Sequence, residues 1–227
     1  MGMDLLGSDF PYASNALQGK HALVCGASKG IGRATAMMMA KAGANVTVCA
    51  RNAASLAELC DELSALGTGE HASLVLDLED QAALQSSLPL LLSQRGAVHI
   101  LVNNAAYPRT RDRVPVQELD DDLWKRIVEV NLNGAMFCSK YAARQMLKQG
   151  QGGSIISISS GAAIKAPVNF AAYAASKAGV HALTSSLADE LGPAGITANV
   201  IAPGFLDTSR IDMLREEGRW EKRLSTI

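Results

Sequence analysis

Excess charge of either sign is missing from this sequence. Its 227 residues include 21 lysines and arginines against 22 aspartates and glutamates, which leaves a formal net charge of −1. Proteins that bind nucleic acid or anionic membranes by electrostatic attraction usually carry a basic surface. The charge balance therefore gives no reason to expect either partner.

Long apolar runs are missing as well. No stretch approaches the roughly 20 apolar residues that a membrane-spanning helix needs. The first residues also lack a basic segment followed by an apolar core, so we predict no signal peptide. Cytoplasm is the expected compartment.

Cysteine and histidine are scarce, with four of each. The histidines show no HExxH or comparable spacing, and no CxxC pair occurs, so no metal site is predicted. Cys25 and Cys49 lie in apolar, strand-like runs, which indicates buried thiols in a reducing compartment rather than disulfides.

What the sequence does contain is a regular alternation of strand and helix patterns. Strands are predicted at 21–25, 45–50, 72–76, 98–102, 154–159 and 197–201. Helices are predicted at 31–42, 53–66, 80–94 (interrupted near Pro89), 119–149, 171–191 and 208–220. Such alternation is typical of βαβ units, so we expect one α/β domain over 20–227, a Rossmann-type doubly wound parallel sheet, after an N-terminal arm over 1–19. Ligands of such sheets bind at the carboxyl ends of the strands.

Two residues of the predicted helix 171–191 carry candidate chemistry. Tyr173 and Lys177 are four residues apart, so they share one face of the helix. An ammonium ~4 Å from a phenol would stabilise the phenolate by on the order of 4 kcal/mol before desolvation, at an effective dielectric of about 20. The phenol would then serve as a general acid or base, and the Ser160 hydroxyl could hydrogen-bond a substrate oxygen. The alternative is an ordinary helix surface.

A glycine-rich turn lies between the first predicted strand and the first predicted helix. Such a turn lets backbone amides approach a pyrophosphate at a helix N-terminus. A plain strand-to-helix turn would need only one of its three glycines. The predicted cofactor-binding residues of the turn are Gly26, Ser28, Lys29, Gly30, Ile31 and Gly32.

The end of the second predicted strand indicates which dinucleotide binds. An Asp or Glu there would bind the adenosine 2′-hydroxyl of NAD. This sequence has Arg51 instead, which suits the 2′-phosphate of NADP, and Lys29 could join it. We therefore expect NADP(H), with NAD(H) less favoured. The alternative is that both side chains are solvated surface cations.

Polar residues also follow the next two predicted strands. Asp77 and Leu78 follow the third strand, where the carboxylate could accept a hydrogen bond from an adenine amine. Asn103 and Asn104 follow the fourth, where their side chains could tie strands together, contact the cofactor or start a loop. Asp77, Leu78, Asn104 and Ala105 are predicted to contact the cofactor.

These motifs occur in an order and spacing that resemble the classical short-chain dehydrogenase/reductase (SDR) family. The resemblance covers about residues 20–208. It rests on GASKGIG, NNAA, the Asn of VNLNG, Ser160, Tyr173-xxx-Lys177 and Pro203-Gly204.

The resemblance implies a role for each residue. Ser160 rather than Ser159 would be the catalytic serine, because it stands thirteen residues before Tyr173. Lys177 would bind the nicotinamide ribose, and Asn131 would anchor a water that relays protons to Lys177. Further cofactor contacts are implied for Tyr173, Pro203, Gly204 and, at the nicotinamide carboxamide, Thr208.

The sequence also departs from the family pattern. Cys25 replaces the usual Thr, and Ala106 replaces the usual Gly after NNA, which is tolerable if its φ is negative. The sequence ends at Ile227, where family members usually continue through another helix and a seventh strand, so this sheet could lack the last strand.

The expected substrate pocket is mostly apolar, which favours a ketone or secondary alcohol with little charge. For any single wall residue, plain packing is the simpler explanation. Three arginines of the loop after the fourth predicted strand, Arg109, Arg111 and Arg113, could bind a carboxylate or phosphate, but a solvated loop face is the simpler interpretation. The predicted walls are Ala162, Ile164, Val168, Phe170, Phe205, Leu206, Met213 and Leu214.

Together these features predict an NADP(H)-dependent oxidoreductase that transfers a hydride between nicotinamide and a carbonyl or secondary alcohol. Ser160, Tyr173, Lys177 and Asn131 form its expected catalytic set. The alternative is a dinucleotide-binding regulatory module with little or no turnover. The resemblance further implies a homodimer or homotetramer, built by pairing the helices 119–149 and 171–191 with their copies.

Overall fold

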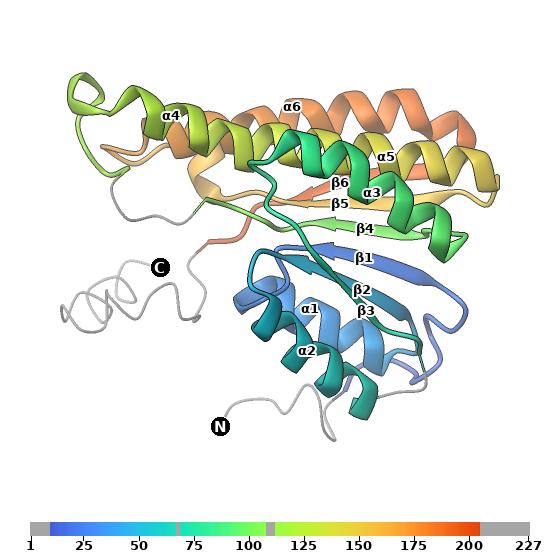
Figure 1. The fold of residues 1–227 in the computed structure, drawn as a ribbon. Coiled ribbons are helices and arrows are strands. Elements are labelled where there is room, and N and C mark those ends of the chain that lie inside the picture. Colours follow the sequence, from blue (N-terminus) through green and yellow to red (C-terminus); the bar gives the residue numbers. More distant parts are fainter. Residues whose placement is uncertain (1–9, 67–68, 108–111, 205–227) are drawn as a thin grey trace.

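Six parallel strands form the centre of the molecule, as the sequence predicted. The computed structural model describes residues 10–66, 69–107 and 112–204 (Figure 1). The strands lie in the order β3-β2-β1-β4-β5-β6. Their bounds are β1 His21–Cys25, β2 Asn45–Ala50, β3 Ala72–Val75, β4 Ile100–Asn103, β5 Gly153–Ile158 and β6 Ile196–Ile201.

Helices cover both faces of this sheet. Figure 1 shows α1 and α2 on one face and α3, α5 and α6 on the other. The helices are α1 Gly30–Lys41, α2 Ala53–Leu66, α3 Gln81–Arg95, α4 Asp121–Val128, α5 Gly134–Gln149 and α6 Ala171–Leu191. Short 3₁₀ turns lie at Val116–Glu118, Gly161–Ala163 and Gly192–Ala194.

The period of two along each strand divides the core into two clusters. On β1, Leu23 and Cys25 face the helices α3 and α5, whereas Val24 faces α1 and α2. On β4, Leu101 and Val102 divide in the same way. Both faces of every central strand are therefore buried, which explains why the strands read as continuous apolar runs.

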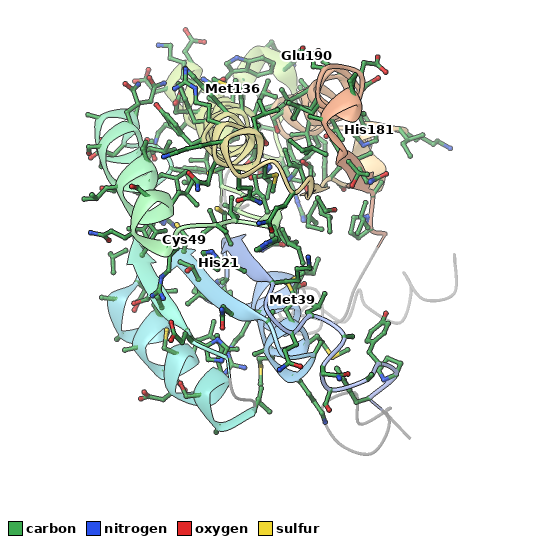
Figure 2. The ribbon with its side chains drawn as sticks, turned by 90° about the vertical axis from the view of Figure 1, so that its right-hand side faces the viewer. His21, Met39, Cys49, Met136, His181 and Glu190 are labelled. Atoms are coloured by element: carbon green, nitrogen blue, oxygen red, sulfur yellow. The ribbon has the colours of Figure 1, made fainter. Side chains whose placement is uncertain are left out.

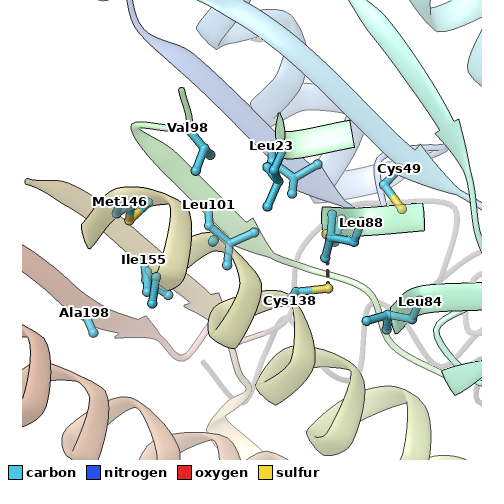
Figure 3. Close-up of a cluster of buried hydrophobic side chains, with 14 of the residues drawn as sticks. Leu23, Cys49, Leu84, Leu88, Val98, Leu101, Cys138, Met146, Ile155 and Ala198 are labelled. Carbon is cyan, nitrogen blue, oxygen red and sulfur yellow. Dashed lines mark hydrogen bonds between the residues drawn. The ribbon is translucent and has the colours of Figure 1, made fainter. Parts of the chain in front are cut away.

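Three thiols lie inside the first cluster, and Figure 3 labels two of them, Cys49 and Cys138. Cys25 and Cys49 are paired residues of neighbouring strands, and the Cys25 Sγ lies 3.6 Å from the Cys138 Sγ on α5. All three are free and buried, which confirms the expected state of Cys25 and Cys49. The hydrogen bond with Cys138 and burial hold the pKa of Cys25 well above its ordinary value, so this thiol is a poor nucleophile.

The direction in which the strands follow one another changes between β1 and β4. The chain leaves β1 toward β2 on one side, and β4 starts the other half of the sheet, so the strand order reverses between them. Cys25 pairs with Cys49 on β2 and with Asn103 on β4 at this end. The loops that follow β1, β4 and β5 therefore meet at one edge, where the chemistry was expected.

The helix α3 does not break at Pro89, so the predicted interruption is wrong. The helix is unbroken from Gln81 to Arg95. A proline inside a helix costs about 3 kcal/mol, but Leu84, Leu88 and Leu92 point at the sheet and are at most 2% exposed. Burying each leucine contributes roughly 1.5–3 kcal/mol, so packing outweighs the lost hydrogen bond.

The predicted helix 119–149 is also not one regular helix. It begins at Asp121, because the Asp120 carboxylate caps it by accepting from Leu123 N at 2.7 Å. After Val128 the chain forms a π-helical segment, Glu129–Asn133, before α5 starts at Gly134. A π segment inside an α-helix is often found at functional sites, and this one contains Asn131.

The N-terminal arm begins to pack before β1. Leu17 lies against the cluster under α1 and α2, and its backbone N–H bonds to Ala42 O at 2.7 Å. The division into an arm over 1–19 and a domain over 20–227 stays a prediction. The predicted tail helix over 208–220 lies outside the described residues.

Candidate active site

The glycine turn after β1 is held so tightly that two of its glycines cannot be replaced without movement. Gly26 has φ +80°, and a Cβ there would come within 2.6 Å of the Ala105 backbone. A Cβ on Gly32 would meet the Asn104 side chain and the Gly26 carbonyl. These contacts favour the phosphate-binding interpretation, because a plain turn would not require both glycines.

The side chain of Asn104 holds the glycine turn in place. Its Nδ2 donates to Gly26 O at 2.8 Å, and its backbone N–H bonds to Cys25 O at 3.1 Å. Asn103 instead donates to Ser139 Oγ on α5 at 2.9 Å. Both asparagine side chains thus tie elements together, which is one of the three roles that the sequence suggested for them. Ala106 does not have a positive φ, so the replacement of glycine there is tolerated as expected.

The N-terminus of α1 fits a pyrophosphate. Lys29 occupies the N-cap position without a side-chain cap, and the first turn holds no acidic residue. The first amides of the helix are therefore available to an anion, and the helix dipole favours one. Lys29 is exposed, Ser28 and Gly30 are half-buried, and the Ile31 side chain packs against the core.

Arg51 and Asp77, both predicted to bind the adenosine half of the cofactor, lie close to each other. The Arg51 Nη1 is 3.6 Å from the Asp77 Oδ2, and both side chains are substantially exposed. An exposed pair of this kind contributes at most about 1 kcal/mol, so it can open for a ligand. Asp77 also accepts from Glu79 N at 3.1 Å. Leu78 is buried in the core, so only its backbone can face a ligand.

Tyr173 and Lys177 lie in the interior on α6, with 4% and 3% of their surface exposed. The Lys177 Nζ donates to Ile158 O, at the end of β5, at 2.7 Å. The ring of Phe170 stands edge-on to the Tyr173 ring at 6.5 Å. This burial excludes the alternative that the two residues form an ordinary helix surface.

The two serines after β5 have different surroundings. Ser160 is half-buried and caps the 3₁₀ turn Gly161–Ala163, its Oγ accepting from Ala162 N at 3.2 Å. A hydroxyl that accepts from a backbone amide keeps its own proton for another acceptor. Ser159 is buried and bonds to α6 instead. The expected choice of Ser160 is consistent with these positions.

Asn131 joins the loop after β4 to α6. Its Oδ1 accepts from Tyr107 N at 2.7 Å, and its Nδ2 donates to Ser176 Oγ at 2.9 Å. Ser176 in turn donates to Tyr173 O at 2.8 Å. The side chain is thus occupied by protein groups, and the water relay to Lys177 stays a prediction.

The substrate side is described only in part. Ala162 is buried and Phe170 half-buried, while Ile164 and Val168 are 76% and 87% exposed. The Arg113 guanidinium lies 5.1 Å from the Phe170 ring centre. The predicted residues that lie outside the described ranges are Arg109, Arg111, Phe205, Leu206, Thr208, Met213 and Leu214.

The end of β6 borders the same site. The carbonyl of Pro203 accepts from Gly161 N at 3.0 Å, which places it beside the turn that Ser160 caps. Gly204 follows and is exposed. Both residues therefore lie at the edge where the cofactor was expected.

Sequence reasoning missed four residues that hold the site together, namely Tyr107, Ser159, Ser176 and His181. His181 could have been found, because it follows Lys177 by four residues and so continues the Tyr173 face of α6. Tyr107 could not, because it acts through its backbone N–H, which every residue except proline carries.

Neither a metal cluster nor a membrane span is found among residues 10–66, 69–107 and 112–204. No three His, Cys, Asp or Glu side chains gather there in a way that could hold a metal ion. No helix of that part is long and apolar enough to cross a membrane.

The sequence is similar to known dehydrogenases and reductases. It matches the family model of the short chain dehydrogenases over residues 20–221. It is 40% identical over 194 residues to the short chain dehydrogenase/reductase astE of Aspergillus oryzae, covering 85% of this chain and 73% of that protein. It is also 40% identical over 202 residues to the 3-oxoacyl-[acyl-carrier-protein] reductase FabG of Escherichia coli, covering 89% and 80%.

Solved structures share the fold. A carveol dehydrogenase from Mycobacterium avium in complex with NAD superposes with a TM-score of 0.82 at 29% identity, over 87% of this chain and 74% of that one. A Beutenbergia cavernae structure with bound NADP at low occupancy gives 0.83 at 35% identity, over 91% and 80%.

The parallel sheet is thus shared with solved dehydrogenase structures over most of the chain. The resemblance noted from the sequence motifs is confirmed by the family match over most of the chain. The protein belongs to the short-chain dehydrogenase/reductase family, and it is an oxidoreductase that uses a nicotinamide dinucleotide to interconvert a carbonyl and an alcohol.

Proposed function

We propose that the protein is an NADP(H)-dependent reductase of a small ketone or oxoacyl substrate, with Tyr173 as the proton donor. The observation that carries this proposal is the burial of Tyr173 and Lys177 on one face of α6, beside the end of β5. The similarity to 3-oxoacyl reductases supports the substrate class, and Arg51 supports NADP.

Each member of the catalytic set has a distinct role in this proposal. The bound nicotinamide supplies or accepts the hydride. Tyr173 holds the proton at Oη and transfers it to the substrate oxygen. The Ser160 hydroxyl accepts from Ala162 N and therefore keeps its own proton. It donates this proton in a hydrogen bond to the same substrate oxygen and stabilises the charge that develops there. The Lys177 ammonium favours the phenolate that remains.

Asn131 supports the set from outside the reacting atoms. Its two hydrogen bonds fix Tyr107 N and Ser176 Oγ, and Ser176 bonds to the carbonyl of Tyr173. The helix turn that carries Tyr173 is thereby fixed relative to the loop after β4. A tyrosine that is held in this way can approach its substrate in one orientation only.

A panel of ketones, 3-oxoacyl thioesters and secondary alcohols, followed by NADPH absorbance, tests the proposal. We expect one of these classes to be reduced by the wild type and Tyr173→Phe to lose at least about a hundredfold in kcat, in line with the typical contribution of a general acid. The Phe variant should still bind NADPH, measured by fluorescence. Wild-type turnover by the Phe variant would show that Tyr173 is not the proton donor.

The alternative function, a dinucleotide-binding regulatory module, predicts a different result in the same assay. It would bind NADPH tightly and reduce none of the panel. The full catalytic set argues against it, because a module that only binds the dinucleotide has no need of Ser160 or Tyr173.

A further inference from the structure

The Ser159 side chain bonds to the catalytic face of α6. It is 5% exposed. Its Oγ lies 3.2 Å from Lys177 O and 2.8 Å from the Nε2 of His181. Its backbone N–H bonds to Ile201 O at 2.7 Å, which extends the pairing of β5 with β6 by one residue. Ser159 is therefore fixed through both its backbone and its side chain.

The hydrogens of this contact can be placed from chemistry. The Lys177 carbonyl can only accept, so the Ser159 hydroxyl donates to it. A hydroxyl has one proton, so His181 must donate its Nε2–H to Ser159 Oγ. In an α-helix the carbonyl of residue 177 also accepts the N–H of residue 181. Ser159 therefore bridges the side chain and the backbone of a single turn of α6. Figure 2 shows His181 on this helix.

The residues on either side of Ser159 belong to the proposed catalytic site. Ile158 presents its carbonyl to the Lys177 Nζ at 2.7 Å. Ser160 caps the following turn with its Oγ. Three consecutive residues, starting with the last residue of β5, thus bind the Lys177 ammonium, bind the Lys177 carbonyl and supply the proposed catalytic hydroxyl. A shift of this segment would move all three together.

We propose that Ser159 and His181 form a positioning pair that sets Ser160 and Lys177 in register with Tyr173. Neither residue of the pair touches the reacting atoms, and both act through their neighbours. Misplacement of a catalytic group by about 1 Å can cost on the order of a hundredfold in rate. The pair gives α6 and the end of β5 one relative position, and this inference rests on the function proposed above.

Two variants break the pair at different atoms. Ser159→Ala removes the bridging hydroxyl, and His181→Leu removes the donor while keeping a side chain of similar bulk. Because each breaks the same chain of bonds, both should lower kcat by about tenfold or more and leave the substrate KM within about threefold. The double variant should be no slower than the slower single variant, since coupled positions are not additive.

Two further variants separate positioning from general stability. His181→Gln keeps an N–H donor at the end of the side chain and should restore most of the lost kcat. Thr184→Val is the matched control, because Thr184 makes a buried hydroxyl-to-carbonyl bond of 2.7 Å to Val180 O one turn along α6, away from the site. It should lower the melting temperature as much as Ser159→Ala does and leave kcat unchanged.

A measurement that needs no turnover completes the test. In histidine-labelled wild-type protein, NMR should show His181 protonated at Nε2, with a ring proton that exchanges slowly and is lost in Ser159→Ala. An Nδ1-protonated His181 would overturn the pair. So would wild-type kcat in either single variant, no rescue by Gln, or an equal kcat loss in Thr184→Val. A wild type that reduces nothing would contradict the proposed function, while the NMR result would still decide the pair.

Discussion

At the scale of single residues, the position of Asp77 affects how strongly Arg51 can favour NADPH over NADH. Sequence reasoning examined the end of β2 alone and found no carboxylate there. The structure places the Asp77 carboxylate, in the loop after β3, 3.6 Å from the Arg51 guanidinium. A 2′-phosphate would have to replace Asp77 as the partner of Arg51, so part of its attraction is already offset. We therefore expect a preference for NADPH over NADH that is weaker than an unpaired Arg51 would give.

Arg51→Asp should reverse the cofactor preference. One charge-assisted hydrogen bond contributes roughly 1.5–3 kcal/mol, which corresponds to about tenfold or more at ~1.4 kcal/mol per decade. The aspartate would remove that bond, repel the phosphate and offer the ribose of NAD an acceptor. Titrating NADPH and NADH against the wild type and the variant measures the preference directly. Equal affinity of the wild type for both would leave Arg51 as a surface cation.

Asp77→Asn serves as the companion variant. It keeps the shape of the side chain and its Oδ1 acceptor for Glu79 N, and it removes the negative charge beside Arg51. The wild-type preference for NADPH should increase in this variant. A weaker preference would show that Asp77 does not compete for the guanidinium.

At the scale of elements, the π-helical segment places Asn131 where a regular helix would not. The segment adds a residue to one turn between α4 and α5. Asn131 is 1% exposed, yet both ends of its amide are bonded, to the loop after β4 and to α6. The irregular turn therefore belongs to the site rather than being a defect in the helix.

Asn131→Ala should lower both stability and turnover. It leaves Tyr107 N without a partner, at a cost of about 1–3 kcal/mol for an unsatisfied buried group, and it removes the donor to Ser176 Oγ, which keeps its bond to Tyr173 O. For a protein of this size, each kcal/mol lowers Tm by about 2–4 °C. Steady-state kinetics and thermal unfolding measure the two effects, and kcat should fall even at temperatures where the variant is fully folded.

Asn133→Ala is the control for this prediction. Asn133 lies in the same π segment and donates to Glu129 Oε2 at 2.7 Å, without contacting the site. Its loss should leave kcat unchanged. If both variants reduced kcat equally, the shape of the segment rather than the Asn131 side chain would be responsible.

The elements were predictable where local pattern and packing agree. The β-branched runs of β2 and β5, bounded by glycines or polar residues, fixed their positions to within a residue or two. The predicted interruption at Pro89 was wrong because the free-energy cost of a proline inside a helix is outweighed by the burial of leucines against the sheet. The π segment left no signal in the pattern, because an added residue does not change the apolar residues around it.

The candidate site was predictable where a sequence motif names the residue. Tyr173, Lys177 and the glycine turn were predicted from their spacing and their place in the βαβ pattern, and the resemblance to the family supported them. Contacts between elements were not, because the sequence does not show which strand ends are neighbours. The approach of Asp77 to Arg51 and the bond of His181 to Ser159 both join residues more than 20 positions apart.

At the scale of the whole molecule, the two ends of the sheet carry different polar groups. The residues of the proposed catalytic set gather at the carboxyl end. At the start of β1, His21 donates its Nδ1–H to Ala97 O at 2.5 Å and accepts from the Thr47 hydroxyl at 2.8 Å. Burial, with smaller effects from Arg95 and His99, lowers the pKa of His21. The folded protein therefore holds this histidine neutral.

Stability should fall on mild acidification. Below the ordinary histidine pKa of about 6.5, His21 is protonated in the unfolded chain but stays neutral in the folded protein. The unfolding free energy therefore decreases from about pH 6.5 downward until the lowered pKa of the folded state is reached. Denaturant unfolding at pH 7.5 and pH 5 should show this loss, and His21→Gln should reduce the difference. His71, whose pKa is also lowered by burial, should account for part of the remainder.

Assembly is expected to involve the outer faces of α4, α5 and α6. Trp124 on α4 and Leu147 on α5 are apolar side chains that are 39% and 50% exposed. The small residues of α6 differ in exposure: Ala175 and Ala182 are exposed, whereas Ala171 is half-buried and Ala172 is fully buried, so Ala172 cannot take part in helix pairing. Small exposed residues allow a second helix to approach closely.

A bulky, charged residue on this face of α6 should therefore cause the oligomer to dissociate. Ala182→Arg places a guanidinium where close helix approach needs a methyl group, and it should convert a dimer or tetramer into monomers without unfolding them. Ala57→Arg, on the exposed face of α2 across the sheet, is the control and should leave the oligomer intact. Light scattering at micromolar concentration distinguishes the states. A monomeric wild type, or an oligomer that Ala182→Arg leaves unchanged, would mean that the chain does not assemble through α6.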